Sequence, residues 1–579
     1  MKFQNIYTLF RQQTAEYRGK PVFYSREIDG WKPQNWEDFE EQVHDFACAL
    51  LAKNLTRGAS VAILAGNISE WAIADVAAIA AGGIGVGIYP TSSKEQCAFI
   101  INHSDAEFVV VDTQKQLEKI IDIDAPMPKL KQIICVENTE QVSFEAVTDE
   151  KKLFWKSSSV EAKEVPIIQY QDFLAFGKLN REEFLLKVEE IGFNANPKDT
   201  AIMVYTSGTT GEPKGTMLSH EYILNSCESL RQTIPICDTD VCFSYLPFCH
   251  VAERISGLYN RLSSGISVYF VDDLAKLYAY MLEVKPTVFA SLPRFFEKIY
   301  AKVVSENEKV IEPQKLKDAF GGNIRLATSG GAPLPAEIAD FFARNDLPIL
   351  QAYGLTENIC VAFNRADDFK FETVGKPMPM CQIKIADDGE ILVKSPMMFS
   401  GYYKEPEKTA EMFDENGWLK TGDLGSLDAD GFLKIVGRKK EIIVLSNGKN
   451  VAPALIENLV KENHLVSQCF VYGDGKSYCV ALITLNQTEA ETLAKANEIK
   501  FTNFAELTRN REVFNLISAT VNKSNARLSS SEQIKKFVLL ERDFSADKDE
   551  ITPTLKLKRN VVSERFKNII EKLYESPLF

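Results

Sequence analysis

The chain has 579 residues, of which 45% are hydrophobic and 25% charged, so it resembles an ordinary globular protein and is too long for a single hydrophobic core. We therefore expect at least two domains. The net charge of -14 argues against a general nucleic-acid-binding protein, because no excess of positive charge is available to neutralise phosphates.

Cysteine usage and the apolar segments indicate a reduced, cytoplasmic protein. The eleven cysteines are scattered without a C-x-x-C pair, which argues against a zinc site. The polar start, Met1 to Asn5, differs from a signal peptide. The longest apolar stretch, residues 71–89, contains Asp75 and four glycines. It therefore predicts a buried helix followed by a strand, and no transmembrane segment.

The first part of the chain alternates between helical and strand-like patterns. Apolar residues between Val43 and Leu51 recur at helical spacing. Short apolar runs of strand length follow at 61–64, 84–88, 108–111 and 133–136. This alternation predicts a largely parallel, doubly wound sheet. Residues 140–197 are charged and poorly periodic, and are predicted to be an excursion that leads up to the next motif.

The segment 205–215 follows directly on another apolar run, 201–204, and combines three glycines, four hydroxyl side chains and Lys214. Glycines allow backbone N–H groups to turn toward an anion, hydroxyl groups add donors, and the lysine supplies a positive charge. This composition favours a loop that binds a polyphosphate, although the spacing of an ordinary P-loop is absent. A flexible linker is the alternative reading, but Pro213 beside Lys214 stiffens the segment.

Three further clusters follow in order. Residues 329–333 form a glycine-rich turn whose open backbone could lie along a flat ring, and residues 351–357 supply an aromatic ring, a hydroxyl and a carboxylate. Residues 417–423 place an acid directly after a glycine. Carboxylates suit ribose hydroxyls or Mg²⁺. Core packing or a turn explains each cluster taken alone, but the set in this order favours a nucleotide site.

The pattern changes after residue 380. Turn sequences at 387–389, 416–417 and 430–431 predict an antiparallel β region. A domain boundary is expected in the basic stretch at 437–440. The predicted division is a large N-terminal domain, 1–437, and a small C-terminal domain, 438–579.

With these motifs the chain resembles the acyl-adenylating superfamily, which includes acyl-CoA synthetases, firefly luciferase and the adenylation domains of peptide synthetases. Segments 247–254, 292–297 and 552–559 are similar to its long-chain fatty acid branch. The resemblance implies an α/β fold in which the large domain contains doubly wound sheets and a β-barrel-like part. A small, mobile α+β C-terminal domain rotates about a hinge near Lys440.

The resemblance also implies an activity. A long-chain fatty acid–CoA ligase uses ATP, with Mg²⁺, to convert a fatty acid to acyl-AMP and pyrophosphate, and then transfers the acyl group to CoA. The alternative is a fatty acyl-AMP ligase that passes the acyl group to a carrier protein. Relatives of that kind tend to carry an insertion after the hinge, whereas residues 437–455 run straight through. A silent binding protein should have lost Glu357 or Lys556, and both are present.

Individual roles follow from the resemblance residue by residue. The residues implied to hold the ATP phosphates are Thr206, Ser207, Gly208, Thr209, Thr210 and Lys214. Those implied to flank adenine are Gly330, Gly331, Ala332 and Tyr353. Thr356 would contact the α-phosphate and Glu357 would hold Mg²⁺. Asp423 would bind the ribose hydroxyls, with Arg438 beside it.

The remaining roles concern the acyl transfer. Lys556 would reach from the small domain to the bridging oxygen and the fatty carboxylate, with Lys558 as a nearby rival. His250 would border the acyl and thiol entrance, and Gly448 would line the passage of the CoA pantetheine arm. Lys440 is the implied hinge, with the adjacent Lys439 as the alternative. Chain-length preference and oligomeric state are left open, and transient contact with a membrane is suggested only by the poor solubility of the substrate.

Overall fold

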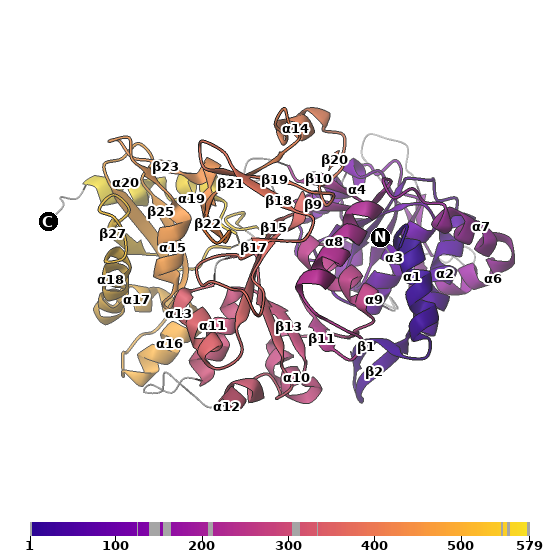
Figure 1. The fold of residues 1–579 in the computed structure, drawn as a ribbon, viewed down its shortest axis with the longest axis horizontal. Coiled ribbons are helices and arrows are strands. Elements are labelled where there is room, and N and C mark those ends of the chain that lie inside the picture. The colour runs from indigo at the N-terminus through magenta and orange to yellow at the C-terminus, as the bar shows by residue number, and fades with distance from the viewer. Residues whose placement is uncertain are drawn as a thin grey trace.

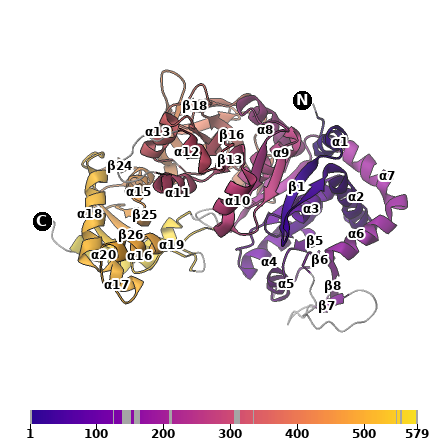
Figure 2. The same ribbon diagram turned by 90° about the horizontal axis from the view of Figure 1, so that it is seen from below.

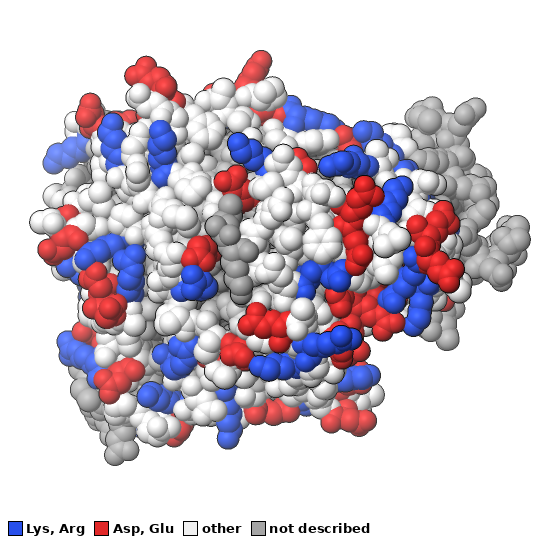
Figure 3. Space-filling model, turned by 45° about the vertical axis from the view of Figure 1, so that its right-hand side comes forward, with Lys and Arg blue, Asp and Glu red and all other residues white. Residues whose placement is uncertain are grey.

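The computed structural model describes residues 3–123, 125–137, 151–154, 164–206, 212–303, 313–332, 334–545, 548–552 and 556–575. Within these ranges six sheets are joined by helices, which confirms the predicted α/β class. Every helix in them falls short of the length and apolar character that a membrane span requires. On the face in Figure 3, basic and acidic side chains alternate, so this face presents no extended field of one sign.

The largest sheet has nine strands in the order β20-β10-β9-β4-β3-β5-β6-β8-β7, and its centre is parallel. Its strands are β3 (Ser60–Leu64), β4 (Ile84–Ile88), β5 (Ala106–Val111), β6 (Gln132–Cys135), β7 (Lys151–Phe154), β8 (Glu164–Gln169), β9 (Thr200–Thr206), β10 (Lys214–Ser219) and β20 (Gly401–Tyr402). In β3, Val61 and Ile63 pack in one hydrophobic cluster, while Ala62 and Leu64 pack in another. Because neighbouring residues face opposite sides, both faces are buried.

Helices cover both faces of this sheet. On one side lie α1 (Ile6–Tyr17), α2 (Trp36–Ala52) and α3 (Ser69–Ala80). On the other side lie α4 (Lys94–His103) and α5 (Gln114–Ile121). The predicted doubly wound arrangement is therefore confirmed, including the helix and strand expected within residues 71–89.

The excursion predicted at 140–197 contains regular structure over residues 151–154 and 164–193. These form β7, β8 and the helices α6 (Tyr170–Leu179) and α7 (Arg181–Phe193), while residues 138–150 and 155–163 lie outside the described part of the chain. In the sequence of these two helices, the apolar residues that make contacts are few and are separated by charged residues. Phe173 packs edge-on against Phe46 of α2, with ring centroids 4.8 Å apart, and Val188 is fully buried. Packing on α2 therefore orders these helices, a contact that local periodicity does not reveal.

Two smaller sheets complete the central part of the molecule. The first, ordered β11-β12-β1-β2, contains β1 (Pro21–Glu27), β2 (Gly30–Asn35), β11 (Val241–Ser244) and β12 (Ser267–Phe270). The second, ordered β13-β14-β15-β16-β17, contains β13 (Val288–Ser291), β14 (Leu326–Ser329), β15 (Ile349–Leu355), β16 (Asn358–Phe363) and β17 (Lys376–Pro377). The neighbouring helices are α8 (His220–Thr233), α9 (Asn260–Ser264), α10 (Leu277–Val284), α11 (Pro293–Val303), α12 (Pro313–Asp318) and α13 (Ala336–Arg344).

A buried charge pair anchors the segment that follows His250. Arg254 lies on the π-helix η1 (Ala252–Tyr259), and both Arg254 and Asp75 of α3 are completely buried. The two form an ion pair, the Tyr259 hydroxyl donates to Asp75 over 2.6 Å, and the Arg254 guanidinium lies 4.8 Å from the Trp71 ring centroid. Because leaving either charge unpaired would be strongly destabilising, the pair holds η1 against α3.

The antiparallel region predicted after residue 380 is confirmed. Its sheet consists of β18 (Gln382–Ile385), β19 (Glu390–Lys394), β21 (Leu419–Leu427) and β22 (Leu433–Arg438), in that order. This sheet forms the part of the molecule that is expected to resemble a β-barrel. Helix α14 (Pro406–Glu411) follows β20. The turn glycines Gly389, Gly417 and Gly431 all have positive φ, as hairpin turns require.

The C-terminal part has its own sheet and core. Strands β25 (Val466–Tyr472), β26 (Cys479–Leu485) and β27 (Ile534–Leu539) pack with helices α15 (Pro453–Lys461), α16 (Gln487–Ala496), α17 (Phe504–Thr508) and α18 (Arg511–Asn525). Helices α19 (Arg559–Arg565) and α20 (Lys567–Glu575) end the described chain. Figures 1 and 2 place these elements together at one end of the molecule and α1, α2, α6 and α7 at the other. The division at residue 437 stays a prediction.

Candidate active site

Two of the predicted motifs leave neighbouring parallel strands. Ser329 at the end of β14 pairs with Gln351 of β15, so the glycine-rich turn and the segment around Tyr353 emerge side by side at the carboxyl ends of the strands. A Cβ placed on Gly330 would lie 3.7 Å from the carbonyl oxygen of Ala352, and Gly331 has a φ of +78°. The turn thus presents open backbone next to the tyrosine, as a site for a flat ring requires.

Thr356 and Glu357 form the two-residue turn between β15 and β16, because Leu355 pairs with Asn358. The approach of the two strands is close: a Cβ on Gly354 would lie only 2.0 Å from the Ile359 carbonyl oxygen, so glycine is required there.

The buried Tyr222 holds this turn through two hydrogen bonds to its backbone. Its hydroxyl accepts a hydrogen bond from the Ile359 N–H (2.9 Å) and donates one to the Thr356 carbonyl (3.1 Å). On the other side of the turn, the Phe399 N–H donates to the Glu357 carbonyl over 2.8 Å. The backbone of Thr356 and Glu357 is therefore fixed before any ligand binds.

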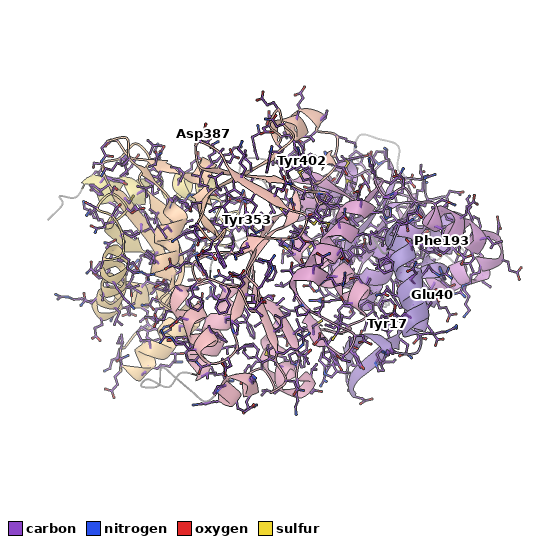
Figure 4. The ribbon with its side chains drawn as sticks, viewed as in Figure 1. Tyr17, Glu40, Phe193, Tyr353, Asp387 and Tyr402 are labelled. Carbon is purple, nitrogen blue, oxygen red and sulfur yellow. The ribbon has the colours of Figure 1, made fainter. Side chains whose placement is uncertain are left out.

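Asp423 and Arg438 are cross-strand partners on β21 and β22. The Arg438 guanidinium lies 2.9 Å from one carboxylate oxygen of Asp423, and the Tyr353 hydroxyl donates to the other. Asp423 is buried, and burial raises the pKa of its carboxyl group, opposed by Arg438 and by the Tyr353 hydrogen bond. Figure 4 shows Tyr353 in the middle of the molecule, where the sheets meet.

The phosphate loop connects two antiparallel strands. Thr206 at the end of β9 pairs with Lys214 at the start of β10. The ammonium of Lys214 lies 4.5 Å from the ring centroid of Tyr402, whose hydroxyl donates to Oε1 of Glu357 over 2.5 Å. The other predicted phosphate ligands, which lie outside the described residues, are Ser207, Gly208, Thr209 and Thr210.

Two ion pairs hold the residue before the predicted hinge. The Lys439 ammonium lies 2.6 Å from Asp388 and 2.7 Å from Glu390, and Glu390 also accepts the Gly422 N–H. Lys440 follows in an exposed 3₁₀ turn, Lys439–Glu441. The chain is thus tied to the antiparallel sheet of β18, β19, β21 and β22 as far as Lys439, which favours Lys440 over its neighbour as the first residue able to turn.

Gly448 lies further along, in the turn between β23 (Ile443–Val444) and β24 (Asn450–Val451). It has a φ of +78°, and a Cβ built on it would have no heavy atom within 4 Å. The space in front of this turn is therefore open, as a passage for a flexible arm requires.

Lys556 lies on a loop of the C-terminal part that Thr552 closes. The Thr552 N–H donates to the Lys556 carbonyl (2.8 Å), and the Thr552 hydroxyl accepts the Lys556 N–H (3.1 Å). Removal of the Lys556 ammonium from water is the main cause that lowers its pKa, and the positive charge of Arg438 also lowers it. The negative charges of Asp423 and Glu441 act in the opposite direction. The lysine is thus within electrostatic reach of the Asp423–Arg438 pair, although its side chain stays exposed. Lys558 instead pairs with Asp549.

His250 precedes η1 and is neutral. Burial, together with the positive charge of Lys556, lowers the pKa of its imidazole to about 4. The Ala252 N–H donates to Nδ1 over 3.1 Å, so the ring proton of the neutral imidazole lies on Nε2. His250 therefore presents an N–H donor, within electrostatic reach of Lys556.

The structure thus groups the predicted residues into a few neighbourhoods. It joins Tyr353 to Asp423 and Arg438, and Lys214 to Glu357 through Tyr402. Lys556 is within electrostatic reach of both Arg438 and His250. Sequence analysis missed Tyr222 and Tyr402, and it considered Lys439 only as the neighbour of the hinge. The pattern that could have indicated Tyr402 is the short Gly401–Tyr402 strand, which only gains meaning when paired with β10.

The carboxylate of Glu357 suits a magnesium ion that arrives with a nucleotide. Among the described residues there is no group of three or more His, Cys, Asp or Glu side chains able to hold a metal alone. Mg²⁺ is commonly bound by one or two carboxylates together with substrate phosphates. One oriented carboxylate beside the phosphate loop fits that donor set.

This combination of sheets, loops and C-terminal part defines an adenylating enzyme. The chain belongs to the AMP-binding enzyme family, which matches residues 10–403, and the AMP-binding enzyme C-terminal domain matches residues 440–577. The chain is also similar to the solved adenylation domain of a carboxylate reductase from Mycobacterium chelonae (TM-score 0.77, 22% identity, covering 99% of this chain and 91% of that one).

Similar proteins span nearly the whole chain. The long-chain-fatty-acid–CoA ligase FadD15 of Mycobacterium bovis is 32% identical, covering 96% of this chain and 94% of that protein. The long-chain-fatty-acid–CoA ligase ACSBG2 of Homo sapiens is 30% identical, covering 98% of this chain and 91% of that protein.

The lowered pKa of His250 predicts an acid-dependent loss of stability. In the unfolded chain the imidazole takes up a proton near its ordinary pKa of 6.5, whereas in the folded protein it does so only near 4. Stability linked to this group is complete above 6.5 and is lost as the pH falls toward 4. We expect the melting temperature of His250→Gln to fall less than that of the unsubstituted protein between pH 7 and about pH 5. His464→Gln, at an exposed position, is the matched control. Parallel curves for His250→Gln and the unsubstituted protein would contradict the prediction.

Proposed function

We propose that this protein is an AMP-forming long-chain fatty acid–CoA ligase. It converts a fatty acid and ATP to acyl-AMP and pyrophosphate, and then transfers the acyl group to CoA with release of AMP. The observation that carries the proposal is that Lys556 of the C-terminal part lies within electrostatic reach of the Asp423–Arg438 ion pair. Near-complete matches to two long-chain-fatty-acid–CoA ligases supply the substrate class.

The first half-reaction joins two anions. A fatty carboxylate oxygen attacks the α-phosphorus of ATP, a P–O bond to pyrophosphate breaks in line with the attack, and no proton has to be removed. The barrier therefore comes from charge repulsion and positioning. In the proposal, Lys556 and Thr356 contact the α-phosphate, Thr206 and Lys214 hold the departing phosphates, and Tyr353 and Asp423 orient adenosine.

Glu357 would hold Mg²⁺, which supplies charge neutralisation on the phosphates when it is bound. The fixed backbone of the Thr356–Glu357 turn supports this assignment, because Tyr222 and Phe399 hold both carbonyls of the turn. Little rearrangement of these groups is needed when the nucleotide arrives, which favours catalysis by pre-organised charges.

The second half-reaction requires a different arrangement. The CoA thiol attacks the acyl carbon, and AMP leaves with the electrons of the C–O bond. Lys556 must withdraw to admit the thiol, and we assign this movement to rotation about Lys440. The ion pairs of Lys439 with Asp388 and Glu390 support a turning point directly after Lys439. With its proton on Nε2, His250 can donate a hydrogen bond at the entrance but cannot accept one there through that atom.

Product analysis tests the reaction. Purified protein is mixed with Mg-ATP and palmitate, with and without CoA, and products are identified by mass spectrometry. Palmitoyl-CoA and AMP are expected. Palmitoyl-AMP that accumulates and ignores CoA would favour the fatty acyl-AMP ligase instead, and the absence of any product from a series of fatty acids would refute the proposal.

Lys556→Ala should separate the two half-reactions. The lysine charge is needed where negative charge develops at the α-phosphate, so acyl-AMP formation should fall on the order of 100-fold or more. Thioester formation from supplied palmitoyl-AMP should change little, because that step has released the lysine. Lys558→Ala, on the same loop, is the matched control, and equal loss of both half-reactions in Lys556→Ala would show that the role is misassigned.

Lys440→Pro should give the opposite pattern. Proline fixes φ and restricts the rotation required between the half-reactions. We expect pyrophosphate release in a single turnover to persist while thioester formation from supplied acyl-AMP falls at least about tenfold. Lys440→Ala, which removes the side chain without stiffening the backbone, controls for loss of the ammonium. A variant that loses adenylation first would place the hinge elsewhere.

A further inference from the structure

Tyr402 connects two groups to which the proposed mechanism assigns separate tasks. Its hydroxyl donates to Oε1 of Glu357 over 2.5 Å, and its ring lies 4.5 Å from the ammonium of Lys214. The tyrosine lies on the short strand β20, where it pairs with Thr216 of β10, the strand that leaves the phosphate loop. Figure 4 shows Tyr402 in the upper middle of the molecule, below the helix that Figure 1 labels α14.

The position of Tyr402 is fixed independently of Glu357. Only 4% of the residue is exposed, its ring packs edge-on against Phe399 with centroids 4.9 Å apart, and its N–H donates to the Thr409 hydroxyl over 2.8 Å. A buried and packed phenol loses little further freedom when it holds a carboxylate. The hydroxyl is therefore a stationary donor.

The hydrogen bond also has a defined direction. A phenol O–H donates and a carboxylate oxygen accepts, so Tyr402 supplies the proton of this hydrogen bond and Oε1 of Glu357 accepts it. Within the described part of the chain Oε2 of Glu357 has no hydrogen-bond partner, so one oxygen is held and the other is available.

We propose that Tyr402 is a positioning residue for the metal-binding carboxylate: it holds Oε1 of Glu357 so that Oε2 is presented to the cation that accompanies ATP. This inference rests on the proposed function, in which Glu357 holds Mg²⁺. Hydrogen-bond partners of metal-binding carboxylates typically contribute 10- to 100-fold to metal affinity, because they orient the group before the metal binds. Through the pairing of β20 with β10, the same residue keeps this carboxylate in register with the phosphate loop.

The neighbouring residue provides a matched control. Tyr403 also donates to a carboxylate, that of Asp105, over 2.8 Å, but this pair lies beside His103 of α4 and away from Glu357. Tyr402→Phe and Tyr403→Phe therefore each remove one hydroxyl and one tyrosine–carboxylate hydrogen bond from adjacent positions. Both retain the ring, so the contact between Lys214 and the ring of residue 402 is preserved.

The experiment measures metal binding directly. Free Mn²⁺ is followed by electron paramagnetic resonance during titration of the protein saturated with α,β-methylene-ATP, which cannot release pyrophosphate. Tyr402→Phe should weaken Mn²⁺ binding at least about tenfold, whereas Tyr403→Phe should bind as the unsubstituted protein does. Melting temperatures of both variants establish that each is folded.

A second readout separates orientation from general damage. If Tyr402 acts through Glu357, a high Mg²⁺ concentration should restore the rate of acyl-AMP formation in Tyr402→Phe, because the metal site is weakened and not removed. Unchanged Mn²⁺ binding in Tyr402→Phe, or equal weakening in Tyr403→Phe, would overturn the inference.

Glu357→Gln distinguishes the failure of this inference from failure of the proposed metal role. If Glu357→Gln weakens Mn²⁺ binding and Tyr402→Phe does not, the carboxylate holds the metal and the inference about Tyr402 is wrong. If neither variant changes Mn²⁺ binding, the assignment of the metal to Glu357 is itself wrong, and the inference falls with it.

Discussion

The ion pair between Asp423 and Arg438 is the interaction on which the arrangement of the site depends. It links β21 to β22, the last strand before the chain turns toward its C-terminal part, and Tyr353 joins it from the neighbouring sheet. A buried carboxylate is stable as an ion only with such partners. The same charges act on Lys556, so one ion pair joins the segments around Tyr353 and Arg438 and lies within electrostatic reach of the lysine that the C-terminal part supplies.

A second constraint is the crowding of negative charge that ATP and a fatty carboxylate would bring. The structure accommodates this negative charge with side chains whose positions are fixed before a ligand binds. Tyr222 holds the Thr356–Glu357 turn by its backbone, and Tyr402 holds the Glu357 side chain. Hydroxyl donors of this kind orient a carboxylate without neutralising it, which leaves its charge available to a cation. Both tyrosines are buried, and burial keeps them protonated.

The residues before the proposed hinge are held by ion pairs, whereas the hinge residue itself lies exposed. Arg438 and Lys439 are each tied to carboxylates of the antiparallel sheet, while Lys440 is exposed in a short 3₁₀ turn. A rotation confined to few residues can carry Lys556 away from the site without disturbing the Asp423–Arg438 pair. The ion pairs of Arg438 and Lys439 thus define where the proposed hinge can begin.

The sequence by itself determined the class of the fold, the order of its motifs and the residue types of the site. Periodic apolar runs specify buried strands and helices. The residue types of a Gly-rich or acidic turn likewise determine which ligand groups it can bind, wherever the fold places that turn. The tertiary structure alone decided which motifs meet. Helices α6 and α7 are ordered by contacts with α2, and Tyr402 gains its partners only when β20 pairs with β10. Such contacts join residues far apart in the chain, so no local pattern encodes them; they arise because buried polar groups and apolar faces must each find a partner when the chain packs.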